Sequence, residues 1–549
     1  MRRTSALLWE IVRERRRGAG PLKSRDSDWS PQSLSPAVPP TEERQQDPET
    51  LLNHYLSGYD HGLAAASASS FTAQNPLDAL ECQGPIVETD TDVLVGSSAD
   101  WLLPDPQSIN LPARTSLSLQ PFQQFPIASI SSLQRTVPDH RMSLDPEEEL
   151  ALTHYRTAFS LSQTTRDPQW STPALLLLHA LKHSEMLLHL ILAVSLHDMS
   201  SDAPDVSRLR RDGHRHYEKG TEQLMQTLQC DTGIDHLAVL ASFYCIYMYM
   251  SRSSGTVLSK LDRLSLAATE HLEKHKLTVP DYGSTPSGRQ DPAQKRAERS
   301  LIARTIMWLM KIDAQGSFLG CKSSLVDHFQ AHPEQLSAVQ ADSRLALQLN
   351  WGAEYPISQS IRDIESCLPV DMMTDMLVFN CKISDLSHML PSPEADIRFT
   401  KLQEELAALE LRYGAVFYYG SSDMTLQPAM KLNCANSATM FHALRIYLLR
   451  SGESPFGAGD SAEVQTALGQ LLMFARHVCP AGTQQPVYEF QWSLFIAALE
   501  TSDMIHREWL QARISDRRFC EASQRIASFK RGNSGTVALS AIRQILQAI

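Results

Sequence analysis

The stretch ALLLLHALKHSEMLLHLILAVSL, residues 174–196, is the most apolar part of the chain. It is long enough to cross a bilayer, but Lys182, His183 and Glu185 lie in its middle, where charged groups would be costly in a membrane. We therefore expect it to form part of a helical segment, 172–199, that is not a membrane span.

Periodic apolar segments continue from Pro146 to the last residue. In IARTIMWLMKIDAQ, residues Ile302, Ile306, Leu309 and Met310 recur at helical spacing, and strand-like alternation is nearly absent. Prolines fall mostly between the segments, where they can end a helix. The fold class predicted is all-α, with a large single helical domain over 146–549. The other helical segments expected are 147–163, 205–229, 234–252, 257–276, 294–320, 337–350, 357–366, 370–389, 398–418, 432–451, 461–479, 486–512, 517–530 and 535–548.

Residues 1–145 differ sharply in composition. Half of the prolines, 15 of 30, fall within residues 1–146, among runs of serine and glutamine. Such a segment buries too little apolar surface to offset the entropy lost on ordering the backbone. We predict a disordered N-terminal arm over 1–145.

Charge and cysteine usage narrow the class of protein. The net charge of −12 argues against binding nucleic acid through bulk electrostatics. None of the nine cysteines belongs to a C-x-x-C pair, which is typical of reduced thiols in an intracellular protein.

Motifs of catalysis are missing from the sequence. It contains no phosphate-binding loop, no G-x-S-x-G and no H-E-x-x-H. His179 and His183 share a helical spacing, and His189 with Glu185 leaves a metal site as the lesser alternative to polar groups partnered within the fold. We expect no catalytic, cofactor or metal site, and we predict that the chain is not an enzyme.

Several segments, in order, resemble the fungal-specific transcription factor domain, which is the helical regulatory region of zinc-cluster activators. Residues 154–199 resemble its opening, and His216–Leu228, His236–Ser254 and Met307–Gly320 resemble later helices, the last with its aspartate at Asp313. Gln491–Ala512 resembles a late signature of the family. The residues that match it are Trp492, Leu494, Phe495, Ile496, Ala497, Glu500, Thr501, Asp503, Arg507 and Trp509.

One part of the family pattern has no counterpart. Members normally carry an N-terminal cluster of six cysteines that hold two zinc ions, whereas this sequence has only Cys82 before Cys230. Either the cluster is missing from this version of the sequence, or the protein acts without its own DNA-binding module. Zinc is expected as a cofactor only in the first case, and DNA binding stays open because no DNA-binding motif is present.

The composition of two parts of the arm gives each an expected role. Two basic patches fit nuclear import, or else a solvated charge run; their residues are Arg15, Arg16, Arg17, Lys23 and Arg25. Residues 78–113 lie in a stretch, 45–113, with no Lys or Arg and ten acidic residues. Its apolar clusters fit an activation segment that docks on a coactivator, the alternative being an acidic linker. The residues singled out are Asp92, Asp100, Trp101, Leu102, Leu103 and Asp105.

Together these features predict a nuclear regulator of RNA polymerase II transcription in a fungus. The resemblance implies control of metabolic or secondary-metabolite genes. The expected partners are coactivators and, as a dimer, a second copy or a related regulator; no membrane is expected. A helical cofactor or interaction protein without its own DNA-binding module is the alternative.

Overall fold

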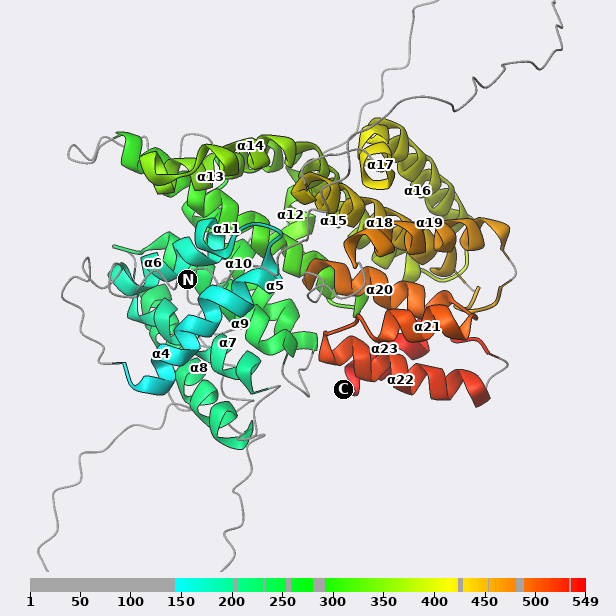
Figure 1. Cartoon of the computed structure of the whole chain (residues 1–549), viewed down its shortest axis with the longest axis horizontal. Coiled ribbons are helices and arrows are strands. Elements are labelled where there is room, and N and C mark those ends of the chain that lie inside the picture. The colour runs from blue at the N-terminus through cyan, green and yellow to red at the C-terminus, as the bar shows by residue number, and fades with distance from the viewer. Residues whose placement is uncertain are drawn as a thin grey trace, which may run out of the picture. The chain divides into compact units, whose positions relative to one another are not determined.

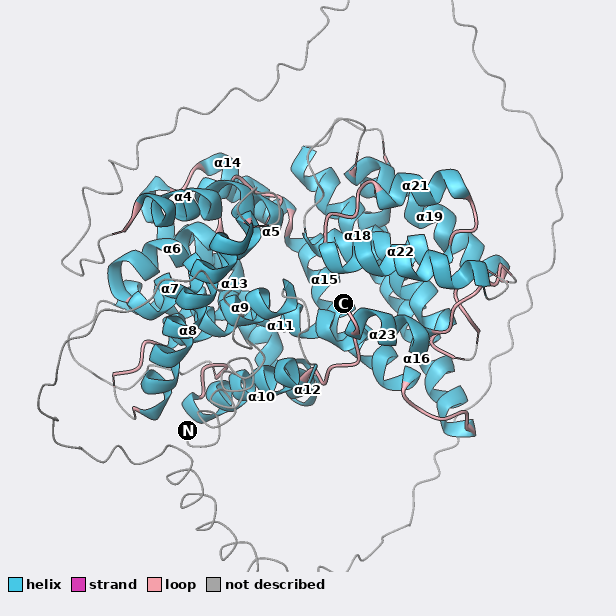
Figure 2. Ribbon diagram, turned by 90° about the horizontal axis from the view of Figure 1, so that it is seen from below, coloured by secondary structure: helices cyan, strands magenta, loops and turns pink. Residues whose placement is uncertain are grey.

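The computed structural model describes residues 144–549 except for short gaps. These gaps are 201–205, 231–232, 253–257, 280–291, 423–427, 453, 460, 480–487 and 533–534. The described residues form helices and loops without a β-strand, and their single β contact is an isolated bridge between Phe456 and Val537 (Figure 2). The all-α prediction is confirmed. The arm up to residue 143 lies outside the described residues, so the predicted domain boundary stays a prediction.

In chain order, a first group of helices ends at residue 354 and a second begins at residue 357, although α14 (Ile357–Glu365) of the second group lies among the helices of the first (Figure 1). The first group comprises α4 (Pro146–His154), a π-helical turn (Tyr155–Phe159), α5 (Ser160–Gln163), a 3₁₀ turn (Pro168–Trp170), α6 (Thr172–His183), α7 (Glu185–Met199), α8 (Val206–Gln229), α9 (His236–Arg252), α10 (Leu258–His275), α11 (Pro292–Phe318), α12 (Ser324–Ala331), α13 (Pro333–Trp351) and a 3₁₀ turn (Gly352–Glu354). The second comprises α14 (Ile357–Glu365), α15 (Cys367–Ser387), α16 (Pro393–Arg412), α17 (Gly414–Ser421), α18 (Pro428–Arg450), α19 (Ala462–Val478), α20 (Tyr488–Glu500), α21 (Met504–Gln511), α22 (Arg517–Gly532) and α23 (Leu539–Gln547).

The apolar stretch of residues 174–196 forms two helices instead of one. Ser184 has an extended backbone, and its hydroxyl accepts a hydrogen bond from the Leu187 amide, which caps the start of α7. Serine is a favoured N-cap because its oxygen satisfies an amide that has no partner inside the helix. The single segment predicted over 172–199 was wrong on this point, since the cap ends α6 and begins α7.

The core is built around helices that are buried on every side. Every residue of α7 from Met186 to Leu196 and every residue of α9 from Leu237 to Met250 is buried. A helix that is apolar all round belongs in the interior of a large protein. The run FYCIYMYM, residues 243–250, is therefore part of the core.

Two glycines let α8 lie close against α7. A Cβ atom at Gly220 would come within 2.6 Å of Leu190 Cγ, and one at Gly213 within 3.3 Å of the Ala193 carbonyl oxygen. These two positions are seven residues apart, so they lie on one face of α8. Any larger side chain at Gly220 would push the two helices apart.

Polar side chains from distant segments close the end of α11. Asn380 of α15 donates to the Ala314 carbonyl at 2.8 Å, and Ser384 donates to the Ser317 carbonyl at 2.7 Å. Arg543 of α23 donates through Nε to the Phe318 carbonyl at 3.0 Å. Because the last four carbonyls of a helix have no partner inside it, the contacts at Ser317 and Phe318 cap α11, and all three contacts join it to α15 and α23.

A second polar contact lies wholly inside the later group of helices. Arg450 of α18 and Glu500 of α20 form a two-pronged ion pair, with Nη2–Oε1 at 2.8 Å and Nε–Oε2 at 3.1 Å. Their side chains are 1% and 0% exposed. Glu500 also accepts a hydrogen bond from the Gly457 amide at 3.1 Å, so its charge is well compensated.

We expect Arg450→Ala to lower the free energy of unfolding by about 3–5 kcal/mol, because it leaves the Glu500 carboxylate buried without its cation. Urea denaturation followed by circular dichroism measures the change. The control is Arg445→Ala, which removes a partly exposed pair with Glu463 and should cost less than about 1 kcal/mol. Equal losses in the two variants would contradict the expected effect of burial.

Candidate functional site

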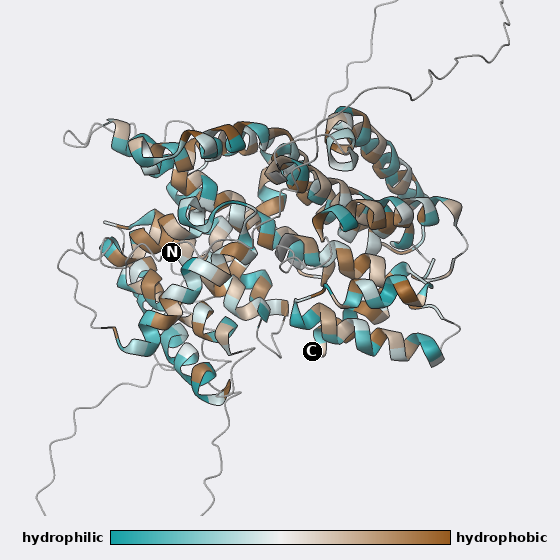
Figure 3. Cartoon of the chain, in the orientation of Figure 1, coloured by the Kyte–Doolittle hydropathy of each residue, from teal (hydrophilic) through white to brown (hydrophobic). Residues whose placement is uncertain are grey.

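The solvent-facing side of α14 is apolar, whereas an ordinary surface helix turns its apolar side toward the core. Ile357 and Ile364 are 80% and 74% exposed, and Ile361 and Leu368 are 47% and 40% exposed. Their spacings of four, three and four residues place all four on one side of the helix, with Leu368 at the start of α15. We call these four residues the α14 stripe. The ribbon of α14 lies at the upper edge of the helices in Figure 1 and carries hydrophobic segments in Figure 3.

The opposite side of α14 is held by polar contacts. Asp363 pairs with Arg166, and it accepts a hydrogen bond from the Tyr355 hydroxyl at 2.9 Å. Ser366, just after α14, accepts one from the Asn433 amide at 2.8 Å. Burial lowers the pKa of Arg166 and raises the pKa of Tyr355, so these groups lie in surroundings poor in water.

Aromatic rings support the segment that leads into α14. The Trp170 ring centroid lies 5.1 Å from that of Trp351 and 6.2 Å from that of Tyr355, both edge to face. This geometry is favourable for aromatic pairs. The base of α14 is thus rigidly anchored while its apolar stripe faces away from the body. Apolar residues exposed together in this way are typical of protein contact sites.

The sequence prediction of a helix over 357–366 was correct, but the orientation of its apolar side was not foreseen. Amphipathic spacing gives the angle between residues on one helix and says nothing about which side meets the body. The nearest signal is Gln359 and Asp363, polar residues four apart that the structure places on the inner side.

The histidines considered as a metal alternative are divided between two places. His179 Nε2 contacts Asp235 Oδ2 at 2.7 Å, next to His183, whose ring centroid lies 5.1 Å away. His189 instead contacts His216, with 2.8 Å between their Nδ1 atoms. Glu185 lies beside His189 and accepts a hydrogen bond from Lys219 at 2.8 Å.

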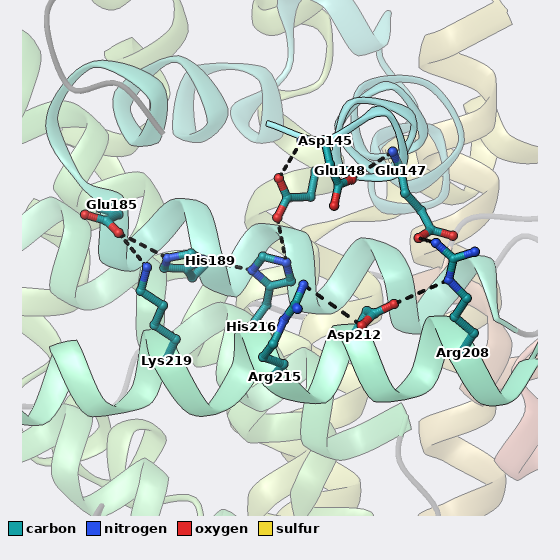
Figure 4. A network of polar contacts seen from close by, with 10 residues as sticks. All are labelled: Asp145, Glu147, Glu148, Glu185, His189, Arg208, Asp212, Arg215, His216 and Lys219. Atoms are coloured by element: carbon teal, nitrogen blue, oxygen red, sulfur yellow. Dashed lines mark hydrogen bonds and ion pairs between the residues drawn. The ribbon is translucent and has the colours of Figure 1, made fainter. Parts of the chain in front are cut away.

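His189 and His216 belong to a network that joins α4, α7 and α8 (Figure 4). His216 Nε2 lies 3.0 Å from Glu148 Oε1, and Glu148 also bonds Asp145 in the capping box of α4. Two nitrogens that share one hydrogen bond cannot both carry a proton, so at least one of the two rings is neutral. Burial lowers the pKa of His189 to about 4 and also lowers the pKa of His216. The network is suited to fixing α4 on α7 and α8.

A different group of histidines does meet, and sequence reasoning missed it. His236, His271 and His275 place their ring nitrogens within 4.8 Å of one another. The available signal was the spacing of four between His271 and His275, which is the same spacing that drew attention to His179 and His183.

The residues proposed for nuclear import and activation lie outside the described residues. This holds for Arg15, Arg16, Arg17, Lys23 and Arg25, and for Asp92, Asp100, Trp101, Leu102, Leu103 and Asp105. Their roles stay predictions.

The features above define a class: a large helical domain with a surface helix suited to protein contact. Residues 150–534 match the family model of the fungal-specific transcription factor domain, and the chain belongs to that family. It is a family of transcription factor domains and not of enzymes. No curated protein and no solved structure matches the chain significantly. Across the part that the structure describes, no helix combines the length and apolarity of a membrane span.

We expect the stability of this protein to rise with pH between about 4.5 and 6.5, partly through His189. The native pKa of about 4 lies below the unfolded value of 6.5, so the unfolded state binds more protons in this range and is favoured by acid. His189→Asn should therefore reduce the rise by about 1–3 kcal/mol. Urea denaturation at a series of pH values measures the free energy of unfolding of both proteins. If it rises equally with pH in the wild type and in His189→Asn, His189 does not contribute to the pH dependence.

Proposed function

We propose that this chain is a nuclear regulator of RNA polymerase II transcription whose helical domain acts through protein contact. Membership of the family supports regulation of transcription. The observation that carries the contact mechanism is the α14 stripe, where four apolar side chains are exposed on a helix anchored by polar groups.

The partner proposed for the stripe is a second copy of the same chain. Spacings of four, three and four are those of a helix that pairs with another helix along a seam. A two-fold axis at the middle of the stripe would place Ile361 of one copy against Ile364 of the other, and Ile357 against Leu368. Dimers with this symmetry are the commonest oligomers because one self-complementary patch serves both subunits.

The double substitution Ile361→Asp with Ile364→Asp is expected to convert a dimer to a monomer, since each dimer would then bury four carboxylates in its seam. Analytical ultracentrifugation of the full chain measures the change. The fold should persist because both residues are exposed, and circular dichroism checks this.

The matched control is Leu411→Asp, which changes a residue of α16 that is 86% exposed and lies outside the stripe. It should leave the dimer intact. A wild-type chain that is monomeric at micromolar concentration, or a dimer that survives the double substitution, would refute self-association through α14.

The arm is proposed to supply import and activation. The basic residues Arg15, Arg16 and Arg17 fit recognition by an import receptor. In the acidic segment 78–113, carboxylates would keep Trp101, Leu102 and Leu103 in water until they dock on a coactivator.

Residues 78–113 fused to a heterologous DNA-binding domain should activate a reporter gene, and Trp101→Ala should reduce the signal several-fold because the largest apolar anchor is lost. Reporter activity, corrected for protein level by immunoblot, is the measurement. A Thr91→Ala fusion, which keeps every acidic and apolar residue, serves as the control. No signal from the fusion, or no effect of Trp101→Ala, would exclude the activation role.

A second candidate is a cofactor that acts through a related, DNA-bound regulator. It fits the sequence, whose first 229 residues hold one cysteine and not the six of the family's zinc cluster. A DNA-binding assay with the purified chain tests this candidate, because specific binding of DNA by the chain itself would contradict it.

A further inference from the structure

Two antiparallel helices bring three histidines together at one end of the α9–α10 pair. His236 is the first residue of α9, and His271 and His275 are one turn apart at the end of α10. The ring centroids lie 4.6 Å apart for His236 and His275, 4.7 Å for His271 and His275, and 5.3 Å for His236 and His271. His236 Nδ1 and His271 Nε2 are 3.2 Å apart.

The backbone around these rings is held firmly. Asp235 caps α9 by accepting the Ala238 amide at 2.9 Å, and its other oxygen contacts His179, which fixes the position of the adjacent His236. At the other side, α10 ends in a turn with Lys276 at φ 52° and a hydrogen bond from the Leu277 amide to the Leu272 carbonyl at 3.1 Å. His271 itself is only 3% exposed.

We propose that His236, His271 and His275 bind a zinc ion that joins the start of α9 to the end of α10. Zinc takes imidazole nitrogens at about 2.0–2.1 Å in a tetrahedron, which sets neighbouring ligand nitrogens about 3.3 Å apart. The nitrogens here are all within 4.8 Å of one another, so each pair must close by at most about 1.5 Å to reach that geometry. The fourth position is left for water.

The chemistry of the ligands selects this class of metal. Three imidazoles suit zinc and its first-row neighbours, whereas magnesium and calcium require oxygen ligands. The end of α10 carries partial negative charge and favours a cation, which offsets the partial positive charge at the start of α9. The site uses no cysteine, so it is separate from any zinc held by a cysteine cluster. Its effect would be on the stability of the helical core, since α9 is buried along its length.

The test is zinc titration of the full chain, purified without a histidine tag and freed of metal with a chelator. Calorimetry should show one zinc ion bound with micromolar or tighter affinity, and saturating zinc should raise the melting temperature by about 5 °C. Cobalt in place of zinc should give the visible absorption of a four-coordinate site.

His275→Gln and His236→Gln should each weaken binding at least tenfold while circular dichroism in the absence of metal stays unchanged. These two residues are only partly buried, so the variants test the site without emptying the core. The matched control is the double substitution His328→Gln with His332→Gln, a pair with the same spacing and ring centroids 4.7 Å apart. Among the described residues this pair belongs to no group of three mutually close metal ligands, although His328 contacts Glu273 at 2.9 Å.

The control should bind zinc as the wild type does. Failure of the wild type to bind zinc, retention of full affinity in His236→Gln and His275→Gln, or loss of binding in the control would each overturn the proposal.

Discussion

The end of α11 is the point on which the arrangement of the other helices depends. Arg543 donates to the Phe318 carbonyl at the end of the helix, while Asn380 and Ser384 add hydrogen bonds to the Ala314 and Ser317 carbonyls, which also accept from the Ser317 hydroxyl and the Gly320 amide. One turn earlier, Asp313 accepts the amides of Leu325 and Val326 at 3.1 and 3.3 Å and so fixes the start of α12. Asp313 is 3% exposed, and this burial raises its pKa to about 7. Polar groups in such surroundings must be paired, so their directionality sets the positions of α12, α15 and α23 relative to α11.

Most of the helices could be predicted from the sequence because their apolar periodicity is strong. The segment predicted over 205–229 corresponds to α8, Val206–Gln229, and the segment predicted over 461–479 corresponds to α19, Ala462–Val478. The errors came from local caps and short elements. The cap at Ser184 divides one apolar run into two helices, and α12 was missed because its start is stabilised by Asp313, which is distant in sequence.

The candidate sites were harder to predict because they depend on which helices meet. The stripe on α14 has an ordinary amphipathic sequence, and only the contacts of Asp363 with Arg166 and Tyr355 show that its polar side faces inward. The three histidines of α9 and α10 are separated by up to 39 positions in sequence and come together because the two helices are antiparallel. Family membership could be inferred from short motifs, and the family model confirms it. The residues of the arm that were given roles lie outside the described part of the chain, so those roles stay predictions.

The contact between Arg543 and the Phe318 carbonyl spans 225 positions of the chain. During synthesis on the ribosome, α11 therefore emerges long before the arginine that completes its end. At typical elongation rates of about 5–20 residues per second, the delay is on the order of ten seconds or more. Until then the end of α11 lacks the guanidinium that joins it to the last helix of the chain.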